Sequence, residues 1–418
     1  MAKKNGKRIK IKIIAILLIA VFIGATYFAR VQIEGLINGK SLASGTVEEA
    51  NTANFAVHYI NVGQGDSCLI TLPDGKNMLI DAGPGDAEDK VVNYLKNLNI
   101  TAIDYLVLTH SDEDHSGGMD KVLENFDVST IYRPFQIALS TKSFQVEDPL
   151  QYYLEDDEDG VEVNSVSTAC YNAFIKLAYS EKDKDGNDAN VCVFYDGLVI
   201  ENASSGYKFE FFAPLKIAGA PAIGGTSTTE DLGAGFPTVP YDNKNDYSPF
   251  IYLTYQDSSF VFTGDMEKDG EADFVASLTA EEKTKLSGTD VYKCGHHGSR
   301  TSSSEDLLDI LRADYYIISC GKDNSYGHPH AELMTKVNNA LQAKGFTNEG
   351  RIYRTDENGD IIFYAKESEI AICAYNFTQT HYFTWFELAG GAFIVLSLGV
   401  ICIGSPSAYK KVKKYAKK

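Results

Sequence analysis

Short apolar runs of strand length alternate with amphipathic stretches of helix length through most of the chain. In the first half, this pattern predicts helices at 86–98 and 119–126 and strands at 55–60, 68–72, 77–81, 103–108 and 128–132. In the second half, it predicts helices at 267–278, 305–311 and 331–343 and strands at 207–212, 250–255, 258–263, 290–294, 315–319, 351–353, 361–364 and 370–374. Because the two halves repeat one alternation, we expect an α+β fold that is a four-layer αββα sandwich, with two sheets face to face and helices outside.

The alternation weakens between residues 133 and 248, which we interpret as an elaboration around the strand at 207–212. Two acidic stretches inside it, 155–160 and 181–186, place acidic residues at alternate positions before a glycine, as calcium-binding loops do. Neither has a glutamate at the twelfth position of such a loop, where Val166 and Cys192 stand. We therefore favour solvated acidic turns over calcium sites for both stretches.

Both ends of the chain carry an uncharged apolar run beside a cluster of lysines. The first run covers residues 13–29 and the second covers 388–404, and each is at the short end of what spans a bilayer. Basic flanks stay on the cytoplasmic side of a membrane. We therefore expect both termini to be cytoplasmic and residues from about 30 to 385 to lie on the extracellular face of the cell membrane. A cleaved signal peptide is the alternative for the first run.

These features divide the chain into a basic tail with a transmembrane helix or signal anchor (1–30), a linker (31–54), a large exported domain (55–380), a second transmembrane helix (386–404) and a basic tail (405–418). The basic ends hold 12 of the 38 Lys and Arg residues and no acid, so the rest of the chain carries 26 basic against 57 acidic residues. A formal charge of about −31 repels polyanions in general. This charge counts against a broad nucleic-acid-binding surface.

The stretch 109–118, T-H-S-D-E-D-H-S-G-G, follows a predicted buried strand and contains four potential metal ligands. Imidazole and carboxylate groups hold the divalent metals of hydrolytic enzymes. Residues two apart in an extended segment point to the same side, so His110 and Asp112 can hold one ion. The chain then turns, and Asp114 with His115 can address a second ion nearby. Two such ions can activate a shared water and clamp the attacking and leaving oxygens.

Most of the histidines follow predicted strands. Six of the eight lie in three short stretches of this kind: His110, His115, His296, His297, His328 and His330. Asp81 and Asp265 also come directly after strands. Ligands at the ends of several strands are typical of an α/β active site, so we expect these residues to meet. His58 lies inside the strand at 55–60, and we expect it to be structural.

The order of the motifs resembles that of the metallo-β-lactamase superfamily and, more narrowly, of the hydrolase domain of the ComEC family of competence DNA-uptake proteins. The motifs are N-V-G-Q-G-D-S (61–67), L-I-D-A-G (79–83), the stretch 109–118, T-G-D (263–265), G-H-H-G-S (295–299) and Y-G-H-P-H (326–330). The resemblance covers most of residues 55–365 apart from the elaboration. It implies a metallo-β-lactamase sandwich that binds two divalent ions in a groove at the sheet edges.

The resemblance also implies which residues hold the ions. His110 and Asp112 would serve one ion. Asp114 and His115 would serve the other, and Asp265 would bridge the two. We expect Zn²⁺ or Mn²⁺, with Mg²⁺ as a third option.

Catalytic residues follow from the same resemblance. One of His296 and His297 would supply a late metal ligand and the other a proton donor; we assign the ligand to His297 and the catalytic role to His296. His328 and His330 would contact the leaving group or phosphate. Asp114 would join the catalytic group as well as binding metal.

Two positions would support the site. Asp81 would orient the metal ligands. Ser299, with the hydroxyl run at 301–304, comes just before a predicted helix, a placement suited to a phosphate. Helix capping is the alternative for these hydroxyls.

The chain departs from the common superfamily pattern at two places. Asp112 stands where the common motif has histidine, and this harder ligand shifts preference from zinc toward manganese or magnesium. No histidine lies between His115 and His296, so the usual middle ligand is missing. Asn245 or Ser248 could fill its place.

These patterns predict an exported, membrane-anchored, metal-dependent hydrolase. Its substrate would contain a phosphodiester bond, with DNA as one option, and a metal-activated water would cleave it. Two alternatives stay open: a hydrolase of another ester or amide in the cell envelope, and a non-catalytic surface binding module.

Overall fold

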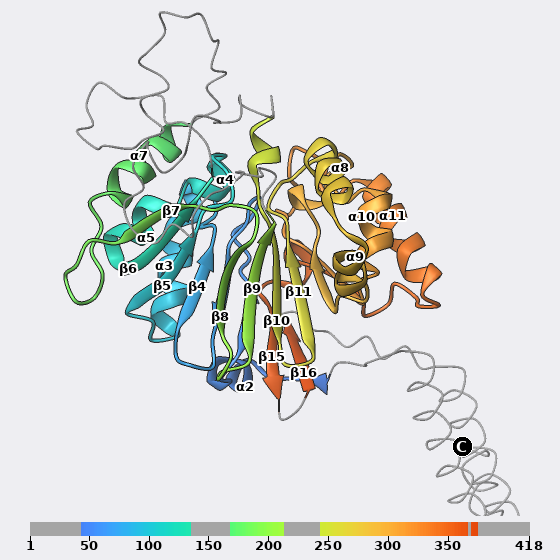
Figure 1. Ribbon diagram of the computed structural model, residues 1–418, viewed down its shortest axis with the longest axis horizontal. Helices are drawn as coiled ribbons and strands as arrows, with labels where there is room; N and C mark the ends of the chain where they lie inside the picture. The colour runs from blue at the N-terminus through green and yellow to red at the C-terminus, as the bar shows by residue number, and fades with distance from the viewer. Residues whose placement is uncertain (1–42, 135–167, 213–242, 367–368, 375–418) are drawn as a thin grey trace, which may run out of the picture. The chain divides into compact units, whose positions relative to one another are not determined.

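Two β-sheets lie face to face in the computed structural model, with helices on both outer sides (Figure 1). The structure describes residues 43–134, 168–212, 243–366 and 369–374. The two predicted membrane segments and the acidic stretch at 155–160 lie outside these ranges. Within them, no helix is both long and apolar enough to cross a bilayer.

The first sheet has the strand order β1-β16-β15-β2-β3-β4-β5-β6-β7. The bounds are β1 Ala43–Ser44, β2 Ala56–Tyr59, β3 Cys68–Thr71, β4 Asn77–Ile80, β5 Ala102–Val107, β6 Asp127–Arg133, β7 Asn190–Val193, β15 Ile361–Lys366 and β16 Glu369–Ala374. Strands β4, β5 and β6 are parallel. The carboxyl ends of β4 and β5, which precede Asp81 and His110, therefore lie at the same edge.

The second sheet has the order β14-β13-β12-β11-β10-β9-β8. The bounds are β8 Leu198–Asn202, β9 Tyr207–Phe212, β10 Phe250–Tyr255, β11 Ser258–Phe262, β12 Val291–Lys293, β13 Tyr315–Ile318 and β14 Ile352–Arg354. Strands β11, β12 and β13 run parallel. Asp265 and the pair His296–His297 follow two of them, so they share an edge of this sheet.

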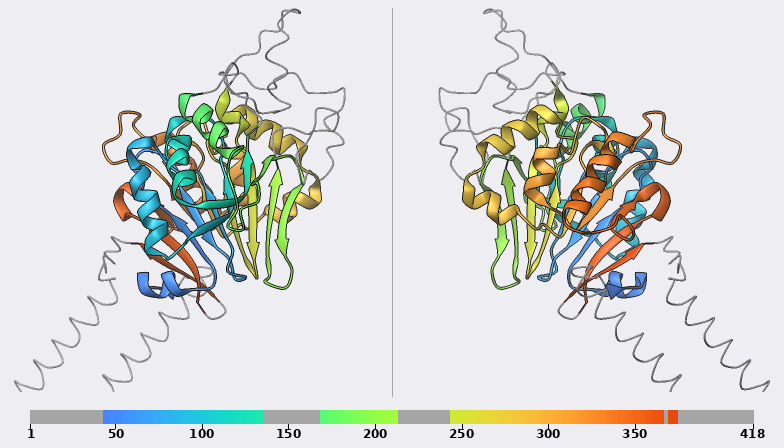
Figure 2. Two further views of the ribbon diagram at one scale, coloured as in Figure 1. Left: turned by 90° about the vertical axis from the view of Figure 1, so that its left-hand side faces the viewer. Right: turned by 90° about the vertical axis from the view of Figure 1, so that its right-hand side faces the viewer.

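Helices cover the outer face of each sheet (Figure 2). Those before residue 200 are α2 Val47–Thr52, η1 Gly85–Ala87, α3 Glu88–Asn97, α4 Glu113–Ser116, α5 Met119–Asn125 and α7 Ala169–Ala178. Those after it are η4 Lys244–Tyr247, α8 Lys268–Ser277, α9 Ala280–Leu286, η5 His296–Gly298, α10 Glu305–Leu311, α11 Ala331–Ala343 and α12 Thr355–Asn358. The apolar faces of α3, α5 and α7 pack on the first sheet, and those of α8, α10 and α11 pack on the second.

The main core lies between the sheets and is rich in aromatic rings, among them Phe209, Phe211, Phe260 and Phe363. β9 alternates buried and half-buried residues, whereas β4 and β13 are buried along their whole length. Strands covered on both faces need apolar residues at every position. The six cysteines of the described residues are all free thiols. The predicted sandwich is thus the observed one.

The predicted linker at 31–54 is folded in its described part. β1 pairs with β16, and α2 begins with a capping box between Thr46 and Glu49. Glu49 also accepts a hydrogen bond from the Tyr364 hydroxyl (2.9 Å) and pairs with Lys366 (2.7 Å). Sequence reasoning missed these elements because they show little apolar period and depend on partners about 315 positions away.

The predicted elaboration at 133–248 contributes more regular structure than the single strand expected. Its described residues include α7, while β7 extends the first sheet and β8 the second. The acidic stretch at 181–186 forms a tight turn, in which Asp183 accepts hydrogen bonds from the backbone N–H groups of Asp185 (2.9 Å) and Asn187 (2.8 Å). This carboxylate is used inside the turn, as the acidic-turn interpretation requires.

Candidate metal centre

The stretch 109–118 turns after β5 into the short helix α4, with Asp112 at the N-cap. Asp81 follows β4 with φ of 58° and accepts hydrogen bonds from the Thr109 backbone N–H (2.8 Å) and hydroxyl (2.8 Å). Its carboxylate also lies 2.7 Å from Nδ1 of His115. Asp81 therefore holds the start of the loop and one of its histidines, which is the placement that an orienting residue needs.

Four histidines turn their Nδ1 atoms toward the surrounding protein. The partners are Asp81 for His115 (2.7 Å), the Ser319 carbonyl for His297 (3.1 Å), the Thr109 hydroxyl for His110 (3.1 Å) and the Glu267 carboxylate for His296 (2.9 Å). A neutral imidazole carries its proton on the nitrogen that donates. In the neutral form that binds metal, these contacts would place the proton on Nδ1 and leave each Nε2 free to act as a ligand.

The Nε2 atoms of His115 and His297 lie 3.3 Å apart and both face Asp265. His115 Nε2 is 3.1 Å from one oxygen of Asp265, and His297 Nε2 is 3.3 Å from the other. Asp114 Oδ2 lies 3.1 Å from His297 Nε2. Ligands of a tetrahedral zinc ion with bonds of ~2.0–2.1 Å are about 3.3 Å apart. These four side chains therefore have the donor types and the spacing of one metal site.

A second, wider group of donors also faces Asp265. His110 Nε2 is 3.8 Å from Asp112 Oδ2 and 3.9 Å from Asp265 Oδ2. His296 Nε2 is 3.7 Å from the same Asp265 oxygen. Nε2 of His110 is buried and has no hydrogen-bond partner among the described residues. A buried nitrogen left unsatisfied costs about 1–3 kcal/mol, so this group fits a second divalent ion that would satisfy it.

Asp66 reaches the same place from the turn between β2 and β3. Its Oδ1 lies 3.4 Å from His297 Nδ1 and its Oδ2 lies 4.0 Å from His115 Nδ1. Asp66, His115, Asp265 and His297 form a buried cluster able to hold a metal ion. However, Asp66 faces the Nδ1 atoms and pairs with the buried Lys293, whereas Asp114 faces Nε2. We therefore assign Asp114 rather than Asp66 as the ligand.

The loop after β12 presents its two histidines through an uncommon backbone conformation. His296 and His297 have φ of 47° and 51°. Such conformations cost about 1–3 kcal/mol each for residues with side chains, and they cluster at functional sites. Gly264, with φ of 50°, precedes Asp265, and a Cβ there would lie 2.8 Å from the Ser248 hydroxyl. The local backbone thus serves the placement of the donors.

Carboxylates dominate the electrostatics of the centre. Burial opposes a charge on His115 and His297, but Asp265 and neighbouring carboxylates outweigh burial and raise the pKa of both imidazoles well above the usual value. Burial also opposes ionisation of Asp265, yet the adjacent histidines hold the pKa of its carboxyl well below the usual range. A divalent cation would replace the protons that these carboxylates otherwise stabilise on the two imidazoles.

Ser248 and Asn245 lie behind the donors. The Ser248 hydroxyl accepts a hydrogen bond from the Asp265 backbone N–H (3.2 Å) and lies 3.4 Å from Nδ1 of His110, away from its free nitrogen. Asn245 donates to Glu267 (3.3 Å). His296, with its Nε2 3.7 Å from Asp265, lies beside the wider group of donors, and neither of these residues takes that place.

The hydroxyl run at 301–304 is not a phosphate site. The backbone N–H groups of Ser303 and Ser304 donate to the buried carboxylate of Glu271 (2.5 and 2.7 Å), and the Ser304 hydroxyl caps α10. The Ser299 hydroxyl is buried and bonds Thr301 (2.9 Å). The Ser304 hydroxyl is thus a helix cap, as the capping alternative expects, and the Glu271 carboxylate occupies the backbone N–H groups that a phosphate would use.

His328 lies beside the centre, with its ring 5.4 Å from that of His296. The Gln64 amide nitrogen lies 3.3 Å from its Nδ1. Burial, reinforced by the neighbouring histidines, lowers the pKa of His328 to about 4. His330 stacks edge-on at 4.8 Å, but its Nδ1 accepts the Arg300 backbone N–H (3.1 Å). His328 lies beside His296, whereas His330 lies beside His328, so His330 is the further of the two from the metal donors.

A cleft of about 640 Å³ opens beside these residues. Its lining is Val62, Gly63, Gln64, Pro84, Asp86, Asp112, Glu113, Asp114, Thr168, Lys244 and Tyr326. Lys244 forms an ion pair with Asp112. Tyr326 is 65% exposed and stacks on His328, with ring centroids 5.7 Å and planes 23° apart. The cleft therefore joins candidate metal ligands to an exposed aromatic ring.

Sequence reasoning missed four residues around the centre: Gln64, Asp66, Glu267 and Lys293. Gln64 and Asp66 lie in N-V-G-Q-G-D-S, a turn between two strands whose motif was visible in the sequence. Glu267 directly follows the stretch T-G-D-M, but no motif in the sequence includes it. Lys293 is a strand residue, and no sequence signal separates a buried lysine of this kind from an exposed one.

A sandwich with buried histidines and aspartates gathered at one edge of its sheets defines a metal-binding hydrolase scaffold. The sequence profile of the metallo-beta-lactamase superfamily matches residues 60–322, and the chain belongs to this superfamily. It is 27% identical over 327 residues to ComE operon protein 3 of Bacillus subtilis, covering 74% of this chain and 33% of that protein. It is 25% identical over 295 residues to Recombination protein 2 of Haemophilus influenzae, covering 69% of this chain and 27% of that protein.

The solved structure of the metallo-beta-lactamase fold protein YhfI from Bacillus subtilis is also similar, with a TM-score of 0.38 and 10% identity over 72% of this chain and 95% of that one. The chain spans a third or less of the length of the two curated relatives. The predicted family is thereby confirmed: the chain is a metallo-β-lactamase superfamily hydrolase related to competence proteins.

Proposed function

We propose that this chain is a metal-dependent phosphodiesterase. The observation that carries the proposal is the convergence of four imidazole Nε2 atoms on the buried carboxylate of Asp265, at distances of 3.1 to 3.9 Å. The relationship to competence proteins supports a nucleotide-containing substrate rather than another ester or amide. A set of intact donors also speaks against a non-catalytic binding module.

The donors divide into two sets that share Asp265. Asp114, His115 and His297 form the tighter set, and His110 with Asp112 forms the wider one. We assign His296 to the wider set, in the place of the missing middle histidine, instead of the proton-donor role that the sequence favoured. Bound divalent ions would supply Lewis acidity to the phosphate and lower the pKa of water.

Residues around the cleft would orient the substrate. Gln64 holds Nδ1 of His328, so Nε2 of this neutral imidazole carries the proton and can donate a hydrogen bond to a phosphate oxygen. Tyr326 offers an exposed ring on which a nucleobase can stack. Acidic residues also line the cleft, which favours a dinucleotide or a strand end over a long duplex.

Turnover of simple diesters tests this function. The purified full-length chain, stripped of metal and then loaded with Mn²⁺ or Zn²⁺, should hydrolyse bis-p-nitrophenyl phosphate and single-stranded DNA. Asp265→Asn should bind less metal and lose at least 100-fold in rate, because the bridging carboxylate is gone. A metal-loaded protein that cleaves neither substrate would refute the proposal, and faster cleavage of carboxylic esters would favour another hydrolase.

We also propose that the terminal apolar runs anchor the domain outside the cell. Their basic flanks, described above from the sequence, support this topology. Protease added to intact cells should digest the central domain and spare epitope tags at both termini. Digestion of the tags before cell lysis would contradict the proposed orientation.

A further inference from the structure

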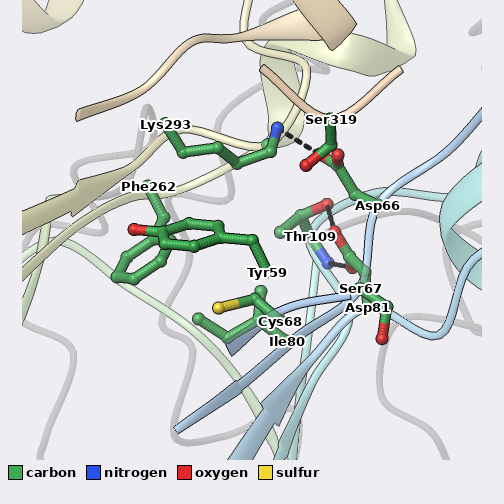
Figure 3. Close-up of a pocket in the computed structure, with 11 residues that line it drawn as sticks. Tyr59, Asp66, Ser67, Cys68, Ile80, Asp81, Thr109, Phe262, Lys293 and Ser319 are labelled. Carbon is green, nitrogen blue, oxygen red and sulfur yellow. Dashed lines mark hydrogen bonds and ion pairs between the residues drawn. The ribbon is translucent and has the colours of Figure 1, made fainter. Parts of the chain in front are cut away.

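We infer that Asp66 and Lys293 form a positioning pair that sets the separation of His115 and His297 from behind (Figure 3). The inference rests on the proposed metal centre but not on its substrate. Neither residue is a ligand in the assignment above. Both are buried, with exposed fractions of 4%.

The pair joins the two sheets at the edge that carries the donors. Lys293 is the last residue of β12 in the second sheet, and Asp66 lies in the turn after β2 in the first. Their side chains meet as an ion pair, and the Lys293 ammonium also donates to the Cys294 carbonyl (3.3 Å). Figure 3 shows the lysine reaching across to Asp66, above the contact between Asp81 and Thr109.

Water has almost no room to solvate these charges. The cavity around them measures about 10 Å³, which is room for at most one water. Tyr59, Phe262 and Ile80 form its apolar side. Each charge therefore depends on the other, and removing one partner would leave the second buried and unpaired.

Asp66 touches both histidines that meet in the tight site, at 3.4 Å from His297 Nδ1 and 4.0 Å from His115 Nδ1. Its backbone is also tied to the ligand loop, because its N–H donates to the Asp114 carbonyl (3.1 Å). A Cβ at Gly65 would lie only 2.4 Å from that carbonyl oxygen. His115 comes from the first sheet and His297 from the second, so Asp66 is a common support for ligands of different origin.

This arrangement makes metal affinity, rather than folding alone, depend on the pair. Carboxylates that support ligating histidines typically change metal affinity by about 10–100-fold when they are replaced. Lys293 holds the Asp66 carboxylate in line with the two Nδ1 atoms. Asp81 and the Ser319 carbonyl each hold one of the two rings. Asp66 contacts both, so without it the Nε2 atoms of His115 and His297, 3.3 Å apart, lose their common support.

The test compares metal affinity with fold stability in three variants of the full-length chain. Asp66→Asn, Lys293→Met and the double variant are titrated with Co²⁺, following visible absorption, and with Zn²⁺ against a competing chelator. The melting temperature of each metal-free protein is recorded in parallel. Asp314→Asn with Lys344→Met is the matched control, because it removes an ion pair of the same kind at a distance from the centre.

We expect Asp66→Asn to bind the tighter ion about 10–100-fold more weakly. The double variant should regain much of the melting temperature lost in Lys293→Met, because no charge is left unpaired, but it should keep the weakened affinity. The control should bind metal like the wild type. Affinity that recovers together with stability in the double variant, or an unchanged affinity in Asp66→Asn, would overturn the inference. A wild-type chain that binds no metal would overturn the proposed centre as well.

Discussion

Asp265 is the carboxylate toward which four histidines of this protein turn. The negative charge of an aspartate among this many imidazoles can be neutralised only by protons or by metal ions. Of the two proposed metal positions, the one in the wider donor set has the less complete set of ligands. His110 and Asp112 supply two donors there, and His296, within 4 Å of Asp265, is the third.

A substitution at His296 should therefore remove one ion and not both. We predict that His296→Asn, equilibrated with Mn²⁺ and dialysed, retains about one ion per chain where the wild type retains about two. His328→Asn is the control and should retain two, because His328 contacts Gln64 rather than Asp265. Metal analysis by mass spectrometry measures both. Two ions retained in His296→Asn would return this residue to a proton-donor role.

The ring of Tyr326 should affect nucleotide substrates alone. Stacking of one base is worth about 1–3 kcal/mol, so Tyr326→Leu should raise KM for thymidine 5′-p-nitrophenyl phosphate by about tenfold or more. Tyr326→Phe keeps the ring and should resemble the wild type. Methyl p-nitrophenyl phosphate has the same leaving group and no base, and its KM should stay unchanged in both variants. An equal loss on both substrates would mean that Tyr326 supports the loop and not the base.

The residues that sequence could identify are those whose type and spacing carry chemistry. His110, Asp112, Asp114 and His115 lie within six positions, and each contacts Asp265 or one of the histidines beside it. Asp66 and Lys293 could not be found in this way, because their role arises from one contact between residues 227 positions apart. The hydroxyls at 301–304 suggested a phosphate site that the structure does not support. A helix-capping run and a phosphate-binding loop have the same composition, so the sequence could not separate them.

At the scale of elements, β2 carries a buried histidine that makes the first sheet sensitive to acid. His58 is 1% exposed and its Nδ1 lies 2.9 Å from the Tyr94 hydroxyl of α3. Burial lowers the pKa of His58 to about 3. Above pH 6.5 the imidazole is neutral in both the folded and the unfolded chain. Below that pH only the unfolded chain binds the proton, so stability falls as the pH drops toward about 3.

This linkage predicts that the free energy of unfolding falls by about 2 kcal/mol between pH 7 and pH 5 because of His58 alone. His58→Asn cannot titrate in this range and should lose less stability over the same interval, although it is less stable at pH 7. Urea denaturation of the metal-free protein at both pH values measures the difference. Parallel losses in the wild type and the variant would show that His58 does not couple to acid unfolding.

Elements with a clear period were predicted within a few residues, among them α10, α11 and β9. Apart from α7, the missed elements are short or lie at sheet edges. α9 begins with a capping box at Thr279 and Glu282, a signal present in the sequence. β7 has one buried residue of four, Cys192, and shows no alternation that a strand would need to be recognised.

For the molecule as a whole, the acidic charge outside the basic ends sets the response to salt. Most nucleic-acid-binding proteins bind more weakly as the salt concentration rises, because binding releases counterions from the nucleic acid. Here the repulsion between an acidic domain and a polyanion is screened instead. We predict that KM for long single-stranded DNA falls by a factor of roughly 2–10 between 50 and 200 mM salt, at a fixed metal concentration. KM for a dinucleotide should change little, and a KM for long DNA that rises with salt would contradict the prediction.

The division of the tight donor set between the two sheets also has a consequence in time. His115 leaves the ribosome 182 residues before His297. At synthesis rates of about 5–20 residues per second, the first imidazole waits roughly 10–40 s for the second. Neither half of the nascent chain can hold the ion as the finished protein does. We therefore expect the proposed centre to take up its ion only after both sheets have formed, from the ions present at that time.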